Sequence, residues 1–277
     1  MAIQSKAQFL NEIHMLLKKR YKPKPDRGAG RLTVLEAVIY AICHEGSTRE
    51  QANQALSRFK DGFFDWNEVR VSSLDEIQGA LTGLSEPEGR SPRIRRFLRQ
   101  LFDRTYGFTL EALTKKPLKD SIKVLQEYEA LGDDYVLATV IQQSLGGHAI
   151  PVDAPSRRAL ERLGVVDAET DNAMLRALLE RAVPKNRGNE FIDLIEELAH
   201  DTCVEGEPDC PQCELRKICP TALTRKDELH PPKAVAKPAK EKEGAAKDKE
   251  PKAAVAKPAK EAVKEPKAAK RKSGGTK

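Results

Sequence analysis

The strongest constraint in the sequence is a cluster of cysteines near residue 210. Four of the five cysteines fall within seventeen residues, as Cys203, Cys210, Cys213 and Cys219, with spacing C-x6-C-x2-C-x5-C. Disulfides are the least favoured use of these thiols, because the first residues show no apolar signal segment and we therefore expect a reducing cytosol. A zinc site usually has two C-x2-C pairs, and only Cys210 and Cys213 form one. A cubane cluster accepts four thiolates from one irregular loop, so the spacing favours iron–sulfur over zinc.

The charge of the chain is unevenly distributed. Its 277 residues are 39% hydrophobic and 32% charged, which allows one large or two modest globular units plus a polar segment. The formal net charge is +6, yet residues 231–277 alone hold fifteen Lys or Arg against six Asp or Glu. Residues 1–230 therefore carry slightly more acidic than basic side chains. No apolar run reaches the length of a membrane span, so we expect no membrane association.

The C-terminal segment is rich in Lys, Ala, Pro and Glu and contains a repeat. Ala234-Val-Ala-Lys-Pro-Ala-Lys-Glu241 recurs as residues 254–261. With almost no large apolar side chains, residues 226–277 cannot bury a core, and we predict a disordered basic tail. It resembles tails of the linker-histone type, which implies sequence-independent attraction to nucleic acid. The alternative is a tail that only solubilises the protein.

The remainder of the chain has helical periodicity and no strand-like alternation, which predicts an all-α fold. The run from Leu32 to Cys43 is apolar nearly all round, so we expect a buried central helix with Cys43 as a core residue. A capping box at Ser73 to Glu76 opens another helix. Further helices are predicted over 3–19, over 49–59 with Thr48 as cap, from Ser91-Pro92 onward, over 170–183 and over 186–200.

The helix expected after Ser91 has an arginine-rich outer face. Several arginines on one helix face could follow a phosphate backbone, and a solvated surface helix is the equally weighted alternative. The arginines concerned are Arg90, Arg93, Arg95, Arg96, Arg99 and Arg104.

A second informative stretch runs from Leu125 to Leu163. It predicts a helix, a turn around Gly132, a helix to Ser144, a glycine turn, and a further helix after Asp153. In a helix-hairpin-helix, a glycine turn lets backbone N–H groups and a helix N-terminus approach a phosphate.

The cysteine spacing and this hairpin segment together resemble the endonuclease III and MutY DNA glycosylases of the helix-hairpin-helix superfamily. The resemblance spans roughly residues 30–222. It implies two helical lobes clasping DNA, and a structural [4Fe-4S] cluster held by the four cysteines. It also implies that Gly132, Arg158, Arg216 and Lys217 lie where the family contacts DNA. For Arg216 and Lys217, ordinary solvated charge is the alternative.

Two positions of the resemblance decide the expected chemistry. The lysine with which bifunctional members form a Schiff base corresponds to Tyr135, and no lysine occurs between Lys123 and Lys185. A tyrosine cannot form the imine, so we expect no lyase step. Asp153 matches the family's essential aspartate, while capping of the following helix is its structural alternative.

Other departures concern DNA contacts and the second acid. The turn carries Asp133 and Asp134 where the family has a base, and the family's wedge position falls at His44-Glu45-Gly46. The glutamate of the adenine-removing branch would lie near Ala41, and only a shifted alignment would recruit Glu36.

The sequence thus predicts four segments. Residues 1–29 form an N-terminal helix and basic linker, 30–200 a glycosylase-like core, 201–222 the cluster loop and 226–277 the tail. We expect a cytoplasmic, nucleoid-associated monomer that binds double-stranded DNA. Its predicted function is monofunctional DNA N-glycosylase in base-excision repair, and a DNA-binding relative without catalysis is the alternative. A redox-sensing role through the cluster is a third, weaker possibility.

Overall fold

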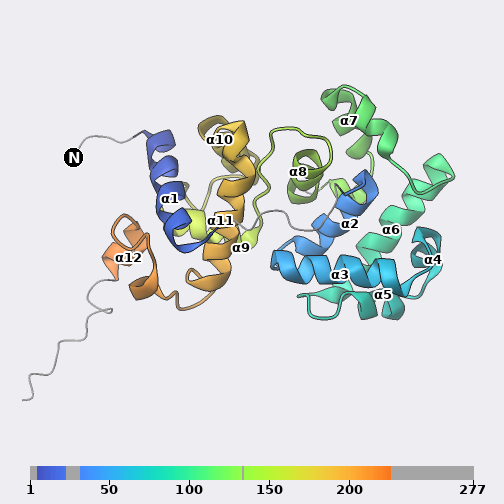
Figure 1. The fold of residues 1–277 in the computed structure, drawn as a ribbon, viewed down its shortest axis with the longest axis horizontal. Coiled ribbons are helices and arrows are strands. Elements are labelled where there is room, and N and C mark those ends of the chain that lie inside the picture. The colour runs from blue at the N-terminus through green and yellow to red at the C-terminus, as the bar shows by residue number, and fades with distance from the viewer. Residues whose placement is uncertain (1–4, 23–31, 133, 226–277) are drawn as a thin grey trace, which may run out of the picture. The chain divides into compact units, whose positions relative to one another are not determined.

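The computed structural model describes residues 5–22, 32–132 and 134–225. These residues all lie in one compact unit, Met1–Pro232, while a second unit, Lys233–Lys277, lies outside them. The described residues form helices joined by turns and contain no strand, as the sequence predicts (Figure 1). The tail prediction and Asp133 fall outside the described residues.

The first of two hydrophobic cores surrounds α2 (Val34–His44), which packs most extensively on α3 (Arg49–Gly62) and α8 (Asp134–Gln143). Ten of the eleven α2 residues are buried, and Cys43 is fully buried among them, so the prediction of a central helix is confirmed. The other elements of this core are α4 (Trp66–Val71), α5 (Leu74–Ala80), α6 (Pro87–Thr105), η1 (Glu111–Lys115), α7 (Leu118–Leu125) and η2 (Glu129–Leu131).

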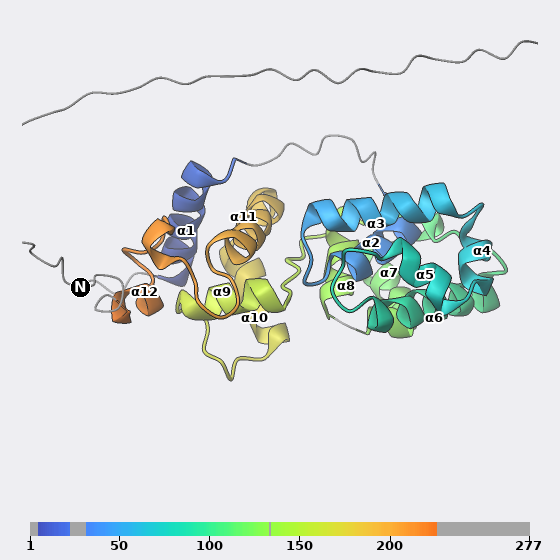
Figure 2. The ribbon, with the colours of Figure 1, turned by 90° about the horizontal axis from the view of Figure 1, so that it is seen from below.

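The second core joins the beginning of the described chain to its end. Helix α1 (Lys6–Arg20) packs on α11 (Gly188–Asp201), which in turn packs on α9 (Ala154–Arg162) (Figure 2). Leu10, Ile13 and Leu17 of α1 are buried in this core. Its other elements are α10 (Asn172–Ala182), η3 (Lys185–Arg187), η4 (Cys210–Gln212) and α12 (Pro220–Thr224).

Side-chain caps define where several helices begin. Thr33, Thr48 and Ser73 each accept a hydrogen bond from the backbone N–H three residues later, and the Glu or Gln there bonds back to the cap residue. These capping boxes satisfy two N–H groups that a helix start otherwise leaves unpaired. The predictions for Thr48 and Ser73 are confirmed.

The predicted helix start at Ser91 is wrong. Helix α6 begins at Pro87, after Glu86 in a left-handed conformation, and Pro92 lies inside the helix. Pro87 meets the same preference for proline in the first helical position that we assigned to Pro92. The buried Ser91 hydroxyl is 3.4 Å from the Gln78 side-chain amide and does not cap the helix.

The arginines of α6 brace the first core. Arg90 donates to the carbonyls of Ile42 and Glu45, and Arg93 binds the Glu45 carboxylate at 2.7 Å and the Ala130 carbonyl at 2.9 Å. Most of the row therefore has protein partners, while Arg96, Arg99 and Arg104 are also exposed to solvent. The remaining contacts join Arg95 to the Ser72 carbonyl, Arg96 to Glu129 and Arg104 to Glu127.

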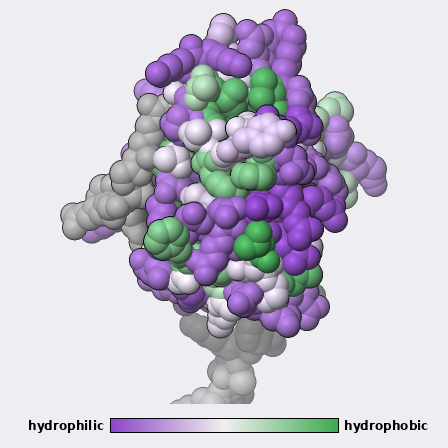
Figure 3. Space-filling view, turned by 90° about the vertical axis from the view of Figure 1, so that its right-hand side faces the viewer, coloured by the Kyte–Doolittle hydropathy of each residue, from purple (hydrophilic) through white to green (hydrophobic). Residues whose placement is uncertain are grey.

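The face of the molecule near α4, α6 and α7 is mainly hydrophilic. Figure 3 shows small, separated hydrophobic patches there between polar side chains. Phe64 and Tyr106 are among the exposed large hydrophobic residues of the described chain. Apolar residues scattered in this way are ordinary on a protein surface.

Candidate functional site

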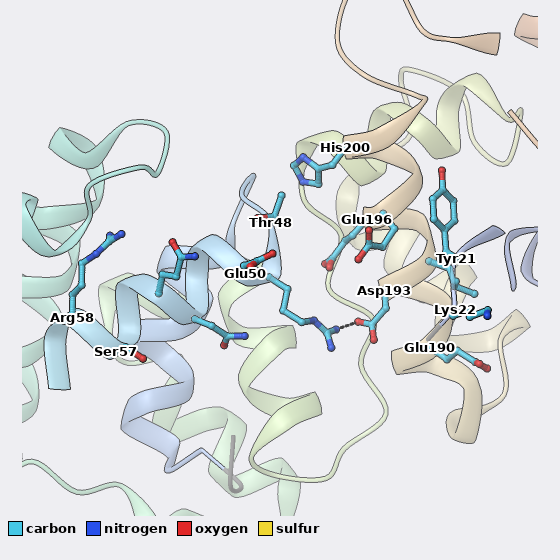
Figure 4. Close-up of a pocket in the computed structure, with 15 residues that line it drawn as sticks. Tyr21, Lys22, Thr48, Glu50, Ser57, Arg58, Glu190, Asp193, Glu196 and His200 are labelled. Carbon is cyan, nitrogen blue, oxygen red and sulfur yellow. Dashed lines mark hydrogen bonds and ion pairs between the residues drawn. The ribbon is translucent and has the colours of Figure 1, made fainter. Parts of the chain in front are cut away.

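A cleft of about 740 Å³ lies between α3 and α11. Figure 4 shows its two walls, with Arg58 and Ser57 on α3 and with Glu196 and His200 on α11. The volume is in the range that holds a nucleotide-sized ligand. The lining residues are Tyr21, Lys22, Thr48, Arg49, Glu50, Asn53, Gln54, Ser57, Arg58, Glu190, Asp193, Leu194, Glu196, Glu197 and His200.

An ion pair joins the two walls of this cleft. Arg49 at the start of α3 binds the carboxylate of Asp193 on α11 (Figure 4). The lining holds five carboxylates against the cations Lys22, Arg49 and Arg58. A polyanion entering the cleft would therefore meet acids on the α11 wall, and separating the walls would break this pair.

A buried polar chain lies behind the α11 wall. The Tyr135 hydroxyl on α8 lies 2.9 Å from His44 Nδ1 at the end of α2. The other ring nitrogen, Nε2, lies 3.5 Å from Glu196 Oε2 but makes no hydrogen bond with any described residue. These three polar side chains, Tyr135, His44 and Glu196, thus connect the two cores. Glu196, the outermost of them, lines the cleft.

Burial controls the ionisation of this chain. Burial, with the nearby Arg49 charge, lowers the pKa of His44 to about 3. Burial, with the Asp193 and Asp153 carboxylates, raises the pKa of Glu196 well above its usual value. Burial also raises the pKa of Tyr135 well above 10. At neutral pH, the imidazole and the phenol are therefore uncharged, and burial favours the protonated form of the Glu196 carboxyl.

Asp153 ties the two cores together. One carboxylate oxygen accepts the Ser156 N–H at 2.9 Å and caps α9, and the other accepts the Gly46 N–H at 3.0 Å. Gly46 has a φ of +68°, which glycine adopts without steric cost. The side chain is 5% exposed. The capping role considered for Asp153 is present, and the wedge position lies against this carboxylate.

The hairpin turn is braced by arginine. Arg176 of α10 binds the Asp134 carboxylate at 3.0 Å, so this acid is partly neutralised at the start of α8. Gly132 is exposed and has a φ of −66°, an ordinary right-handed conformation. The DNA-binding role of Gly132 stays a prediction.

The four clustered cysteines converge on one pocket. Cys203, Cys210, Cys213 and Cys219 all line it, with apolar neighbours that include Leu163, and none forms a disulfide. Within the described ranges, no three or more His, Cys, Asp or Glu side chains are placed closely enough to hold a metal ion. Four sulfur donors facing one apolar pocket fit the chemistry of an iron–sulfur cluster.

Arginines from α9 support the cysteine loop, residues 203–219. Arg158 donates to the carbonyls of Ala199 at 3.1 Å and Cys203 at 3.2 Å, and Arg162 donates to the Val204 carbonyl at 2.7 Å. Arg158 thus makes internal contacts. Arg216 and Lys217 are exposed on the loop, and Arg216 donates to the Pro211 carbonyl at 2.8 Å. Their predicted DNA contacts stay predictions.

Sequence reasoning missed Glu196. It identified Phe191, Ile192, Leu194, Ile195 and Leu198 as the apolar face of this helix and passed over the acid within the same stretch. In the structure, the Glu196 side chain is only 12% exposed. An acid one helical turn after a buried Ile192 was the available signal.

Comparisons with known proteins agree with this architecture. No family model matches the chain. The chain is 22% identical over 218 residues to endonuclease III of Synechocystis sp., a match that covers 79% of this chain and 94% of that protein. It is 27% identical over 113 residues to an endonuclease III homolog of Encephalitozoon cuniculi, covering 41% of this chain and 47% of that protein.

Solved structures give the same result. A trapped endonuclease III–DNA covalent intermediate superposes with a TM-score of 0.64 and 17% identity, covering 81% of this chain and 100% of that one. The chain has the endonuclease III fold. A thermostable thymine-DNA glycosylase superposes with a TM-score of 0.58 and 19% identity, covering 79% of this chain and 97% of that one. The resemblance to helix-hairpin-helix DNA glycosylases is thus confirmed. Among the residues that the structure describes, no helix is both long enough and apolar enough to cross a bilayer.

Proposed function

We propose that this protein is a monofunctional DNA N-glycosylase of endonuclease III type that acts on double-stranded DNA in base-excision repair. The observation that carries the proposal is the buried junction between the two cores. There Asp153 lies against the turn after α2, and Tyr135, which the family resemblance aligns with the lyase lysine, is bound to His44. The endonuclease III fold and the relatives named above support the same function.

Hydrolysis without strand cleavage follows from the side chains at this junction. Helix α8 contains no lysine, and a phenol cannot form an imine with the sugar C1′. Asp153 remains as the carboxylate that stabilises the oxocarbenium-like sugar while water attacks C1′. Breaking the base–sugar bond in this way requires a base flipped out of the duplex, and the cleft has the volume for it.

We also propose that Cys203, Cys210, Cys213 and Cys219 hold a [4Fe-4S] cluster. When bound, the cluster ties the loop together by four iron–sulfur bonds. Arg216 and Lys217 would then approach DNA phosphates from a fixed loop. We propose that the protein acts as a monomer in the cytoplasm, at the nucleoid. The basic composition of residues 226–277 would add attraction to DNA.

A catalytically inactive DNA-binding relative is the second candidate. Both oxygens of Asp153 already accept backbone N–H groups, and the Arg49–Asp193 pair joins the cleft walls. These contacts suit a protein that uses the aspartate as a structural tie.

Base release from a panel of damaged and mismatched duplexes separates the two candidates. The wild-type protein, purified anaerobically, is compared with Asp153→Asn and with Asp171→Asn. Asp171 is a matched control, because it stands at the N-cap of α10 without a side-chain cap bond. The proposal expects base release by the wild type and the control, and its loss in Asp153→Asn with helicity and DNA affinity retained.

No base release from any duplex, together with salt-sensitive DNA binding, would instead establish the inactive relative. Full activity of Asp153→Asn would contradict the role assigned to this carboxylate.

A further inference from the structure

A glycosylase that hydrolyses the bond to a base also needs a proton for the departing base, and two obvious acids are committed elsewhere. One carboxylate oxygen of Asp153 accepts the Ser156 N–H and the other accepts the Gly46 N–H, so both oxygens are already engaged by the backbone. Glu36 accepts the Thr33 N–H at 2.9 Å in the α2 capping box and binds Lys60 at 2.7 Å. The carboxyl groups of both residues are thus engaged by other protein groups.

Glu196 has the position that such an acid requires. It lines the cleft from α11 while its Oε2 lies 3.5 Å from His44 Nε2, so it stands between the buried polar chain and the space for a ligand. His44 is 4% exposed, and its Nε2 atom makes no hydrogen bond with any described residue. A nearly buried nitrogen without a hydrogen-bond partner is costly, and such features concentrate at functional sites.

The proton positions follow from the donors available. If the Tyr135 phenol donates to His44 Nδ1, the neutral imidazole carries its hydrogen on Nε2. That N–H faces Glu196 Oε2. The hydrogen of a neutral Glu196 carboxyl then belongs on Oε1, away from His44.

We infer that Glu196 is the general acid of the proposed glycosylase, with His44 and Tyr135 as the residues that position it. The inference rests on the proposed function. The C1′–N bond breaks with its electron pair leaving on the base, and the Glu196 proton transfers to that base. Water then bonds to C1′, and the proton that it loses returns to the Glu196 carboxylate. The net reaction adds one water and yields the free base and an abasic sugar.

The groups around Glu196 set the pH range of this role. Burial is the largest cause that raises its pKa, and neighbouring acids raise it further, while Arg49 lowers it. A donor must be protonated, so base release should fall as pH rises through this raised pKa. The charged or titratable groups facing Glu196 are Asp193, Glu197 and His200 on α11, Asp153 before α9, Arg49 on α3, His44 on α2 and Tyr135 on α8.

The test measures single-turnover base release against pH, with protein in excess over a duplex from which the wild type releases a base. We compare the wild type with Glu196→Gln, Glu196→Asp and the exposed Glu169→Gln, which makes the same carboxyl-to-amide change outside the cleft. Glu196→Gln should be slower by about 100-fold or more with DNA affinity unchanged. Glu196→Asp should recover part of the rate and the alkaline decline, and Glu169→Gln should match the wild type.

Two further readouts do not depend on the rate alone. Infrared spectroscopy should show a protonated-carboxyl C=O stretch in the wild type at neutral pH that Glu196→Gln lacks. Tyr135→Phe should move the alkaline decline of the rate to higher pH, because His44 can then carry its hydrogen on Nδ1 and no longer offers one to the Glu196 carboxylate.

The outcomes separate this inference from the function on which it rests. Base release by the wild type with a near-normal rate in Glu196→Gln overturns the role of Glu196 and leaves the glycosylase intact. A wild type without the infrared band also overturns it. Absence of base release by the wild type from every duplex overturns both proposals.

Discussion

The cysteine loop and the cleft differ in how their polar groups are satisfied. Around the loop, Arg158 and Arg162 donate to backbone carbonyls, so the loop backbone is held by hydrogen bonds from α9. Beside the cleft, Nε2 of His44 and Nε2 of His200 are buried without a hydrogen-bond partner among the described residues. Glu196 is largely buried there, with its side chain 12% exposed, and its pKa is raised.

This difference separates architecture from chemistry. A saturated network fixes a backbone, whereas buried groups without full partners cost stability and are retained where a ligand or a reaction uses them. We therefore infer that the loop stabilises the second core and that the proposed reaction takes place at the cleft.

The largest expected effect comes from the loop. Cys210→Ala should remove one ligand of the proposed cluster, abolish its visible absorbance and lower Tm by roughly 10 °C or more. Absorbance spectra and thermal unfolding followed by circular dichroism measure both. Cys43→Ala, which alters a buried cysteine outside the loop, should keep the absorbance. If Cys210→Ala left both the absorbance and Tm unchanged, the proposed structural role of the loop would be wrong.

The tie between the cores should have the next largest effect. Asp153→Ala leaves the N–H groups of Gly46 and Ser156 without their acceptor, which should cost about 2–4 kcal/mol of unfolding free energy. Asp171→Ala, at a cap without a side-chain bond, should cost about 0.5 kcal/mol or less. Urea unfolding measures the unfolding free energy of the two variants. Equal losses would show that Asp153 does not stabilise the contact between the two cores.

The buried chain should make stability depend on pH from both sides. Because the folded pKa of His44 is about 3 against an ordinary 6.5, the unfolded state binds a proton that the folded state excludes. Stability should therefore fall as pH drops from 6.5 toward 3. The raised pKa of Glu196 makes stability depend on pH in the opposite direction. Stability should fall as pH rises above 4.5 toward that raised pKa. The His44 effect is on the order of a few kcal/mol.

Substitutions isolate the two contributions. His44→Gln should flatten the acid side of the stability curve, and Glu196→Gln should flatten the alkaline side. His14, whose pKa burial also lowers, contributes equally to the wild type and both variants. Urea unfolding over a pH series gives the unfolding free energy of each protein as a function of pH. Parallel curves for all three proteins would mean that the fold does not keep His44 and Glu196 uncharged.

The smallest effect concerns DNA affinity. Asp193→Asn removes one negative charge from the cleft wall and weakens the ion pair that Arg49 makes across the cleft, which favours a phosphate there. Binding should tighten a few-fold, with roughly one more counterion released in the salt dependence. Glu127→Gln, which releases Arg104 from an ion pair outside the cleft, is the control. A larger change in the control would place the DNA-binding surface away from the cleft.

The sequence predicted the helices well because their signals are local. Thr48 and Ser73 identify helix starts through bonds that span only three residues. Ser91-Pro92 misled because Pro87 carries the same signal and a helix accommodates one internal proline. The roles of the α6 arginines were not predictable, since partners such as Glu45 and Glu129 lie 48 and 33 residues away in the chain.

The site was predicted only in part, because some of its contacts join residues far apart in the sequence. The family resemblance identified Tyr135 and Asp153, and the structure places both against the end of α2, through His44 and Gly46. Glu196 comes from a helix in the other core, 152 residues after His44, and no local pattern reports that contact. A buried partner across such a distance becomes visible only once the chain is folded.

Strand-break analysis of the anaerobically purified wild type tests the central claim most directly. Each duplex of the damaged and mismatched panel is incubated with the protein, and products are resolved with and without alkali. Tyr135 in place of a lysine predicts breaks only after alkali, the result of base release without a lyase step. Breaks without alkali would contradict the account, because they would require an amine or another lyase group at this site.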